Sequence, residues 1–314
     1  MLDKNAHERL IKFSQFIVPH ISYTHAIETI ERAISATATT NEPMSAMLTG
    51  LSGTGKTAVC RYLLKKMPPR ESRQEDDGIT QVVPAFYCAV PAEVTIKGLA
   101  AEMLNKLGSD DIRGDRVALE RRLFRLLATC KTEVIFLDEF HHLLVRGAEK
   151  ARATVCEWVK TLMNETGVPV ILVGMPNCEA IVDEHPQLAR RYPYRAHMIS
   201  IRYSSGDQSE FLKILKAFGK AMNTYAGIEN VVPLTDLYMA SAIYVATGGN
   251  MNSIRQLLYE VVHKSLERGG EMVVREDFVD GFSSIRLENC LLKKRINPFL
   301  MEQNELLAAI AQVS

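Results

Sequence analysis

The stretch Gly50-Leu51-Ser52-Gly53-Thr54-Gly55-Lys56-Thr57 decides the fold of this chain, because it fits the pattern G-x-x-x-x-G-K-[ST]. A short apolar run, residues 44–49, precedes it, and residues 56–67 after it have helical spacing. A glycine-rich turn between a strand and a helix lets backbone N–H groups curl around an anion, and the helix N-terminus adds partial positive charge. The sequence therefore predicts a phosphate-binding loop.

The residue types of this loop predict ATP with Mg²⁺ as the ligand. Lys56 is expected to reach the β- and γ-phosphates, and the Thr57 hydroxyl is expected to coordinate Mg²⁺. The expected nucleotide-binding residues of the loop are Gly50, Ser52, Gly53, Thr54, Gly55, Lys56 and Thr57.

A second motif lies at the end of the apolar run 134–137, where Asp138 and Glu139 follow. We expect Asp138 to hold Mg²⁺, directly or through water. Glu139 is expected to polarise the attacking water as general base. His141 and His142 come next but do not complete H-E-x-x-H, so we interpret them as packing or polar-switch residues rather than metal ligands.

Three further sets of polar residues suit an ATPase that works between subunits. Asn177 follows the apolar run 170–173 and would lie beside the γ-phosphate if that strand neighbours the strand before the loop. One of Arg190 and Arg191 could act as an arginine finger on the next subunit, stabilising transition-state charge. Arg255 could bend back onto the nucleotide and couple the helical region to its phosphate state. The alternatives are an ordinary turn asparagine and solvated arginines.

Strand-like and helix-like segments alternate as far as residue 203, which predicts an α/β fold: a parallel P-loop sheet sandwiched by helices. Only helical segments follow, so we expect a smaller all-helical lid domain. The charged stretch 70–78 is expected to be a surface connection. The predicted strands are 44–49, 82–90, 134–137, 168–173 and 198–201, and the predicted lid helices are 207–225, 234–247, 252–268 and 275–284.

The expected division of the chain has four parts. They are an N-terminal helical extension (1–43), the α/β ATPase domain (44–203), the helical lid domain (204–286) and a C-terminal tail (287–314).

The composition excludes several classes of protein. Of 314 residues, 47% are hydrophobic and 24% are charged, which is ordinary for a globular protein. No apolar run is long enough to cross a bilayer and the first residues are polar, so we expect a cytoplasmic protein with no membrane partner. The 37 basic residues balance 37 acidic ones, so net charge does not favour nucleic acid but permits a local basic stripe. Six scattered cysteines indicate reduced thiols rather than a zinc site or disulfides.

Taken in order, the glycine loop, the Asp138-Glu139 pair, Asn177, the arginine pair and Arg255 resemble the motifs of an AAA+ ATPase, over about residues 44–284. Within that superfamily, the segments 134–143, 173–177 and 187–192 resemble the TniB/TnsC group, the ATP-dependent regulators of transposition.

This resemblance implies that ATP-bound subunits pack head to tail around duplex DNA, as a closed ring or an open helical filament. Hydrolysis would release subunits, and the homo-oligomer would link a target-selector protein or complex to the transposase. The sequence leaves open the ring size or filament geometry, which arginine is the finger, and whether the selector is RNA-guided.

The resemblance also implies that DNA-backbone contacts come from the segment after the second strand. Lys97, Arg113 and Arg121 are the candidates there, among neighbours that include Lys106, Arg116 and Arg122. Because aromatic residues do not interleave with them, binding should be indifferent to DNA sequence. The tail, with Lys293, Lys294, Arg295 and Phe299, is a candidate transposase-docking peptide.

Two other functions remain open from the sequence. One is a helicase-loader or origin-type AAA+ remodeller. The other is a protein-binding signalling ATPase without DNA binding, which the balanced charge would suit.

Overall fold

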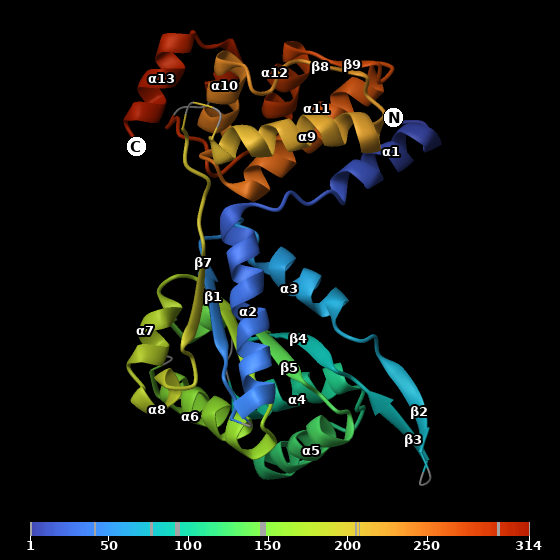
Figure 1. Cartoon of the computed structure of the whole chain (residues 1–314), viewed down its shortest axis with the longest axis vertical. Coiled ribbons are helices and arrows are strands. Elements are labelled where there is room, and N and C mark those ends of the chain that lie inside the picture. The colour runs from blue at the N-terminus through green and yellow to red at the C-terminus, as the bar shows by residue number, and fades with distance from the viewer. Residues whose placement is uncertain are drawn as a thin grey trace. The chain divides into compact units, whose positions relative to one another are not determined.

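The computed structural model describes residues 2–40, 42–75, 78–91, 95–144, 149–204, 206, 208–293 and 296–313. The chain forms two compact units (Figure 1). One is Ser22–Met198, and the other combines Met1–Ile21 with Ile199–Ser314. Every helix among the described residues is too short or too polar to span a lipid bilayer.

The first unit is built on a five-stranded sheet with the strand order β4-β5-β6-β1-β7, in which every pairing is parallel. Three of these strands, β1, β5 and β6, are buried along their whole length, which is why they are continuous apolar runs. This sheet confirms the predicted α/β class. The strands are β1 (Ala46–Gly50), β4 (Ala85–Ala89), β5 (Val134–Asp138), β6 (Val170–Gly174) and β7 (Tyr194–Met198).

Helices cover both faces of this sheet because successive strand residues point to opposite sides. Met47 packs into a core with α4 (Ile96–Leu107), α5 (Arg116–Thr129) and α6 (Glu149–Thr166). Its neighbour Leu48 packs into a separate core with two other helices. Those two are α2 (Ile21–Thr40) and α3 (Lys56–Lys66). Two short helices, α7 (Cys178–Asp183) and α8 (Pro186–Ala189), and the 3₁₀ turn η1 (Phe140–Leu144) complete the unit.

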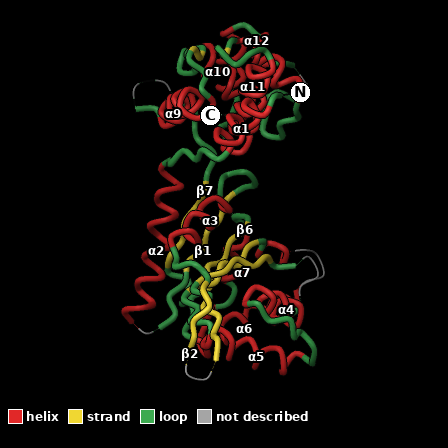
Figure 2. Tube along the Cα trace, turned by 90° about the vertical axis from the view of Figure 1, so that its right-hand side faces the viewer, coloured by secondary structure: helices red, strands yellow, loops and turns green. Residues whose placement is uncertain are grey.

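The sequence prediction was wrong about the connection before β4. Residues expected to be a surface connection form an antiparallel hairpin of β2 (Glu71–Glu75) and β3 (Gly78–Val82), which Figure 2 shows extending away from the sheet. The strand expected at 82–90 is interrupted at Pro84, because proline has no N–H to donate to a ladder. The Pro84 carbonyl instead accepts a hydrogen bond from Glu133 N at 2.7 Å.

The last strand of the sheet was also misplaced, at 198–201 instead of Tyr194–Met198. This is an edge strand that alternates buried and exposed residues, so it carries only a weak apolar signal. Ile201, which suggested a strand, is buried in the second unit, where its N–H donates to the Gly249 carbonyl at 2.9 Å.

The second unit is helical, as expected. The four helices predicted after residue 203 are present within a few residues of their expected bounds, and two short strands form a small parallel pair that the sequence did not predict. The elements are α1 (Lys4–Ser14), α9 (Glu210–Ala226), β8 (Asn230–Val231), α10 (Leu237–Thr247), α11 (Met251–Glu267), β9 (Met272–Val273), α12 (Arg275–Ser284), η2 (Pro298–Leu300) and α13 (Gln303–Ala311).

Residues 1–43, expected as one extension, are divided between the two units. Helix α1 packs on the helical unit, where Phe13 contacts Phe218 with ring centroids 6.4 Å apart. The Arg9 guanidinium donates to the carbonyls of Ala226 (2.5 Å), Gly227 (3.0 Å) and Gly270 (3.2 Å). These carbonyls lie at or just after the C-terminal ends of α9 and α11, so one arginine joins the N-terminal helix to two others. Helix α2 packs in the α/β unit instead.

Phe299, which the sequence placed in a candidate docking peptide, lies in the core of the helical unit instead. Its side chain is 0% exposed and lies against Phe278, with ring centroids 5.1 Å apart. Tyr238 Oη donates to the Phe299 carbonyl at 2.9 Å, which ties the tail to α10. The tail therefore completes the core of the helical unit around this aromatic ring. Lys294 and Arg295 lie outside the described residues.

Two adjacent residues of η2 give a matched test of this packing. We expect Phe299→Ala to lower the free energy of unfolding by about 3–5 kcal/mol, because it empties a buried aromatic site. Leu300→Ala removes a side chain that is 67% exposed and should change it by less than about 0.5 kcal/mol. Urea unfolding monitored by circular dichroism measures both, and equal losses would contradict the packing of the tail.

Candidate nucleotide-binding site

The glycine loop connects the end of β1 to the start of α3, and each of its glycines has a structural reason. Gly53 and Gly55 have φ of 76° and 107°, a left-handed conformation that side chains disfavour. At Gly50 the constraint is space, since a Cβ atom there would lie 2.4 Å from the Met198 carbonyl oxygen. The Thr54 hydroxyl closes the loop by donating to the Leu51 carbonyl at 2.8 Å.

The amino end of α3 is suited to bind an anion. Its N-cap is Gly55, which has no side chain to accept hydrogen bonds from the first turn, and the helix dipole places positive charge there. Lys56 Nζ donates to the carbonyls of Gly50 (2.7 Å) and Leu51 (3.0 Å), so the ammonium lies against the loop. A phosphate oxygen could replace these carbonyls as its partner. Burial lowers the pKa of Lys56, and the nearby carboxylates of Asp138 and Glu139 oppose that shift.

The second motif lies close to this loop, since the carboxylate of Asp138 acts on Lys56. Asp138 ends β5 and is only 3% exposed. Its Oδ1 accepts from Glu139 N at 2.7 Å, and its Oδ2 accepts from the Tyr87 hydroxyl. Burial, followed by the contact with Asp138, raises the pKa of Tyr87. Thr57 and Asp138, the two residues expected to hold Mg²⁺, offer hard oxygen atoms, which are the ligands that this ion prefers.

Tyr87 is a site residue that sequence reasoning missed. It is an aromatic residue within a strand, the usual pattern of a core position. Its contact with Asp138 depends on the pairing of β4 with β5, where Tyr87 lies opposite Phe136 and Ala89 lies opposite Asp138. A sequence without an alignment contains no signal for this register.

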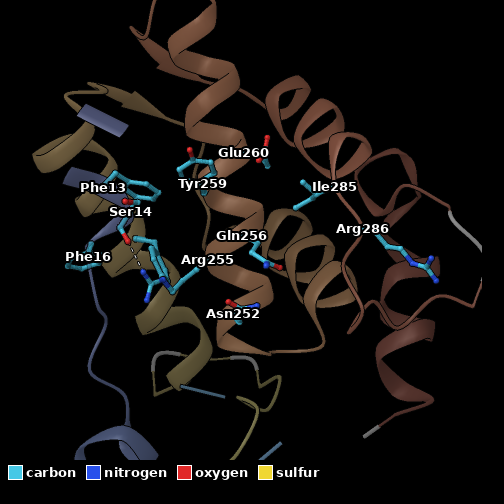
Figure 3. A pocket seen from close by; sticks show the side chains of 11 residues that line it. Phe13, Ser14, Phe16, Asn252, Arg255, Gln256, Tyr259, Glu260, Ile285 and Arg286 are labelled. Atoms are coloured by element: carbon cyan, nitrogen blue, oxygen red, sulfur yellow. Dashed lines mark hydrogen bonds between the residues drawn. The ribbon is translucent and has the colours of Figure 1, made fainter. Parts of the chain in front are cut away.

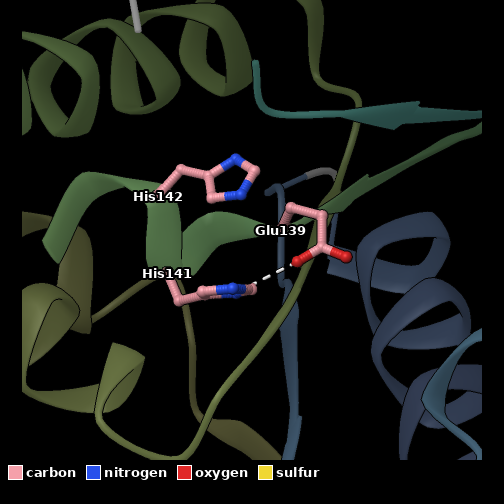
Figure 4. Close-up of side chains that lie close together, drawn as sticks. All are labelled: Glu139, His141 and His142. Carbon is pink, nitrogen blue, oxygen red and sulfur yellow. Dashed lines mark ion pairs between the residues drawn. The ribbon is translucent and has the colours of Figure 1, made fainter. Parts of the chain in front are cut away.

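Glu139 has an unusual backbone conformation, with φ of 59°. Such a conformation is strained for a residue other than glycine and is held here by the Asp138 bond and by the buried residues of η1. Its carboxylate is half-buried, and Oε2 lies 3.2 Å from His141 Nδ1 (Figure 4). The structure therefore brings the two histidines beside the expected general base.

The strand before Asn177 does neighbour the strand that leads into the glycine loop, which was the condition for its predicted position. Strand β6 pairs with β1, with Thr49 opposite Gly174, so the residues that follow both strands lie at one edge of the sheet. Asn177 is exposed at the start of α7. Glu179 on that helix accepts from the Thr49 hydroxyl at 2.7 Å and pairs with His197 at 3.1 Å. These contacts tie α7 to the strand that enters the glycine loop.

Arg190 and Arg191 lie at the opposite edge of the sheet. Ser45 N donates to the Arg191 carbonyl at 2.7 Å, which places the pair at the amino end of β1. The loop begins at the other end of this five-residue strand, roughly 16 Å away at the usual rise per residue. That separation exceeds the reach of an arginine side chain.

The two arginines differ in their contacts. Arg191 donates to Asn164 Oδ1 at 3.0 Å and pairs with Glu42 at 3.5 Å. Arg190 is exposed and makes no side-chain hydrogen bond or ion pair with any part of the chain that the structure describes.

Arg255 belongs to the helical unit, separate from the loop. Its guanidinium donates to the Ser14 carbonyl at 2.6 Å, and burial lowers its pKa (Figure 3). It lines a pocket of about 630 Å³ together with Phe13, Phe16 and Tyr259. Its expected contact with a nucleotide remains a prediction.

The basic residues expected to contact DNA are of two kinds. Lys97, near the start of α4, and Arg121, on α5, are exposed and make no ion pair within the described segments. Arg113 is 92% exposed but pairs with Asp111 at 3.4 Å. The other three are also paired with nearby acids: Lys106 with Glu102, Arg116 with Glu120, and Arg122 with Asp111.

A pair of glycine substitutions tests the shape of the loop. We expect Gly50→Ala to destabilise the protein by about 1–3 kcal/mol, because the added methyl overlaps a backbone oxygen that cannot move freely. Gly219→Ala, in α9, would meet only Leu234 Cδ1 at 3.8 Å and should stabilise instead, by about 0.5–1 kcal/mol. Chemical unfolding distinguishes the two variants. An unchanged free energy of unfolding in Gly50→Ala would contradict the crowding at β1.

Comparisons with known proteins agree with this geometry. No curated protein sequence matches the chain. Cdc6p from Pyrobaculum aerophilum is similar in structure, with a TM-score of 0.60 at 16% identity, over 88% of this chain and 71% of that one. The Aeropyrum pernix ORC1 protein, solved in complex with DNA, has a TM-score of 0.60 at 18% identity, over 85% of this chain and 66% of that one. Identities this low show the fold alone.

A family model described as Bacterial TniB protein matches residues 12–199, more than half of the chain. That match includes the glycine loop, both carboxylates, Asn177 and the arginine pair. The chain therefore belongs to the TniB family, and its fold is that of an AAA+ ATPase.

Proposed function

We propose that this chain is an ATP-dependent regulator of transposition that assembles on duplex DNA and is released by ATP hydrolysis. The observation that carries the proposal is the separation of two half-sites: the phosphate-binding loop and Arg190 lie at opposite edges of one sheet. Because a chain cannot bring its own Arg190 to its own loop, the complete site needs a second copy.

The loop would bind the triphosphate, with Lys56 and the first turn of α3 on the phosphates. Thr57 and Asp138 would hold Mg²⁺, which when bound would offset phosphate charge. Glu139 would take the proton of the attacking water, and Asn177 would contact the γ-phosphate from the neighbouring strand. Support comes from the electrostatic coupling of Lys56 to both carboxylates and from the pairing of β6 with β1.

Head-to-tail contact would place Arg190 of one copy at the nucleotide of the next. A guanidinium that is exposed and unpaired within the described residues is free to do so, whereas Arg191 is held by Asn164 and Glu42. Repetition of such a contact gives a ring or a filament. Arg255 would contact the nucleotide and so couple the helical unit to the phosphate state.

We propose that the copies assemble on duplex DNA. Lys97 and Arg121 are the strongest candidates for backbone contacts, since neither is neutralised by an acid in the described residues. The structurally similar ORC1 protein was solved with DNA, which supports the same ligand here. Membership of the TniB family supports a transposase and a target selector as partners. Docking through the tail would use exposed residues such as Lys293 and Leu300.

Co-sedimentation with duplex DNA tests the proposal. The wild-type chain should pellet with DNA in the presence of Mg²⁺ and a slowly hydrolysed ATP analogue, and not without nucleotide. Lys56→Ala should abolish nucleotide binding and pelleting, because the phosphates lose their charged partner. Lys65→Ala, which removes an exposed lysine from the same helix, should pellet normally. ATP turnover without any DNA association would favour a protein-binding signalling ATPase.

Glu139→Gln separates binding from chemistry. The amide keeps the size of the side chain but cannot accept a proton, so turnover should fall by about 10²–10⁴-fold while ATP binding persists. Assemblies should outlive those of the wild type. Steady-state phosphate release and nucleotide titration measure the two effects, with Glu133→Gln, an exposed acid before β5, as control. Unaltered hydrolysis would show that Glu139 is not the base.

Mixing two inactive variants tests the shared site. Arg190→Ala should lower turnover by about 10³-fold or more without loss of nucleotide binding, and Arg191→Ala should retain turnover. Equal amounts of Arg190→Ala and Glu139→Gln should regain activity, because some contacts then combine an intact Glu139 with an intact Arg190. Absence of any recovery in mixed assemblies would mean that the arginine does not act between copies.

A further inference from the structure

Glu139, His141 and His142 form a cluster with the composition of a transition-metal site. One ligand atom from each residue lies within 4.8 Å of the others (Figure 4). All three residues are half-buried, and all lie at the carboxyl end of β5. Two imidazoles and one carboxylate are a ligand set that Zn²⁺ accepts, with the fourth position left to water.

The shortest distance in the cluster already suits a bound metal. His141 Nδ1 lies 3.2 Å from Glu139 Oε2. Two ligands at about 2.0–2.1 Å from a tetrahedral ion are separated by about 3.3–3.4 Å. The ligand atom of His142 lies within 4.8 Å of those of the other two residues.

The hydrogen bonds of the two rings leave nitrogen atoms available. His142 Nδ1 lies 2.7 Å from the Val90 carbonyl oxygen and must donate to it, so Nε2 carries the lone pair. A backbone carbonyl on the second nitrogen is the usual arrangement of a metal-binding histidine. His141 Nδ1 is shielded from solvent and faces Glu139 Oε2 at 3.2 Å, so the nitrogen and the carboxylate point toward one another.

The backbone holds the three residues together before any ion binds. The left-handed Glu139, anchored by Asp138 Oδ1, turns the chain directly into η1. Phe140 and Leu143 are both 0% exposed and fix that turn to the core. Preorganisation of this kind lowers the entropic cost of collecting ligands.

We propose that Glu139, His141 and His142 bind a transition-metal dication of the Zn²⁺ type, and that the bound ion inhibits ATP hydrolysis. The nitrogen donors separate this site from the all-oxygen Mg²⁺ site of Thr57 and Asp138. An ion on the Glu139 carboxylate prevents that group from accepting a proton, while the glycine loop stays free to bind ATP. The inhibitory effect rests on the proposed function, whereas the metal site itself does not.

Titration of the full chain with Co²⁺ tests the site directly, without nucleotide and in excess Mg²⁺. The wild type should develop the visible absorption of tetrahedral Co²⁺ with a stoichiometry of one, and Zn²⁺ should displace it. His141→Gln and His142→Gln should each weaken Co²⁺ binding by at least about tenfold. His25→Gln, which removes an exposed histidine of α2, should bind as the wild type does. Circular dichroism confirms that the variants are folded.

Two results would overturn the metal site: no saturable Co²⁺ spectrum in the wild type, or an affinity for Co²⁺ in both cluster variants equal to that of the wild type. The ATPase arm uses buffered free Zn²⁺ and saturating Mg-ATP. We expect Zn²⁺ to lower kcat with little change in KM for the wild type, and His142→Gln to resist it. Co²⁺ binding in a chain that hydrolyses no ATP would leave the metal site standing and refute only the proposed function.

Discussion

Parallel pairing of β1 with β6 and β7 is the constraint on which the candidate site depends. It brings the carboxyl ends of these strands and of β5 to one edge, so the glycine loop, Asn177 and the Asp138-Glu139 pair come together from distant parts of the sequence. The same constraint places Arg190 at the other edge. In our proposal these two edges are complementary half-sites, and this polarity of the sheet is why assembly and hydrolysis are coupled there.

The hydrogen bonds that compensate the buried carboxylate of Asp138 determine how the neighbouring side chains are arranged. Asp138 is almost fully enclosed, and a buried charge is costly unless hydrogen bonds compensate it. Tyr87 and the Glu139 N–H provide those bonds. The second bond accompanies the strained backbone of Glu139, which directs its carboxylate and the two histidines to one place. Asp138 as a candidate magnesium ligand, the proposed general base and the proposed zinc site thus share one set of contacts.

Segments near both ends of the sequence pack into the core of the helical unit. Arg9 attaches α1 to carbonyls at or just after the C-terminal ends of α9 and α11, and Phe299 brings the tail into the same core. Carbonyls at helix ends lack partners within their own helices, so a guanidinium that reaches three of them stabilises several elements at once. The N-terminal helix and the tail are therefore parts of this unit.

The sequence by itself determined the α/β class, the position of the phosphate loop, and the helices with a strong apolar period, because local spacing and residue type carry those signals. It failed at the hairpin of β2 and β3 and at β7, where strands are polar or lie at an edge. Tyr87, the contact of Glu139 with the histidines, the separation of Arg190 from the loop and the burial of Phe299 were decided only by the tertiary structure. Each depends on strand register or on packing between segments far apart in the chain, and pairing over such distances leaves no local pattern in one sequence.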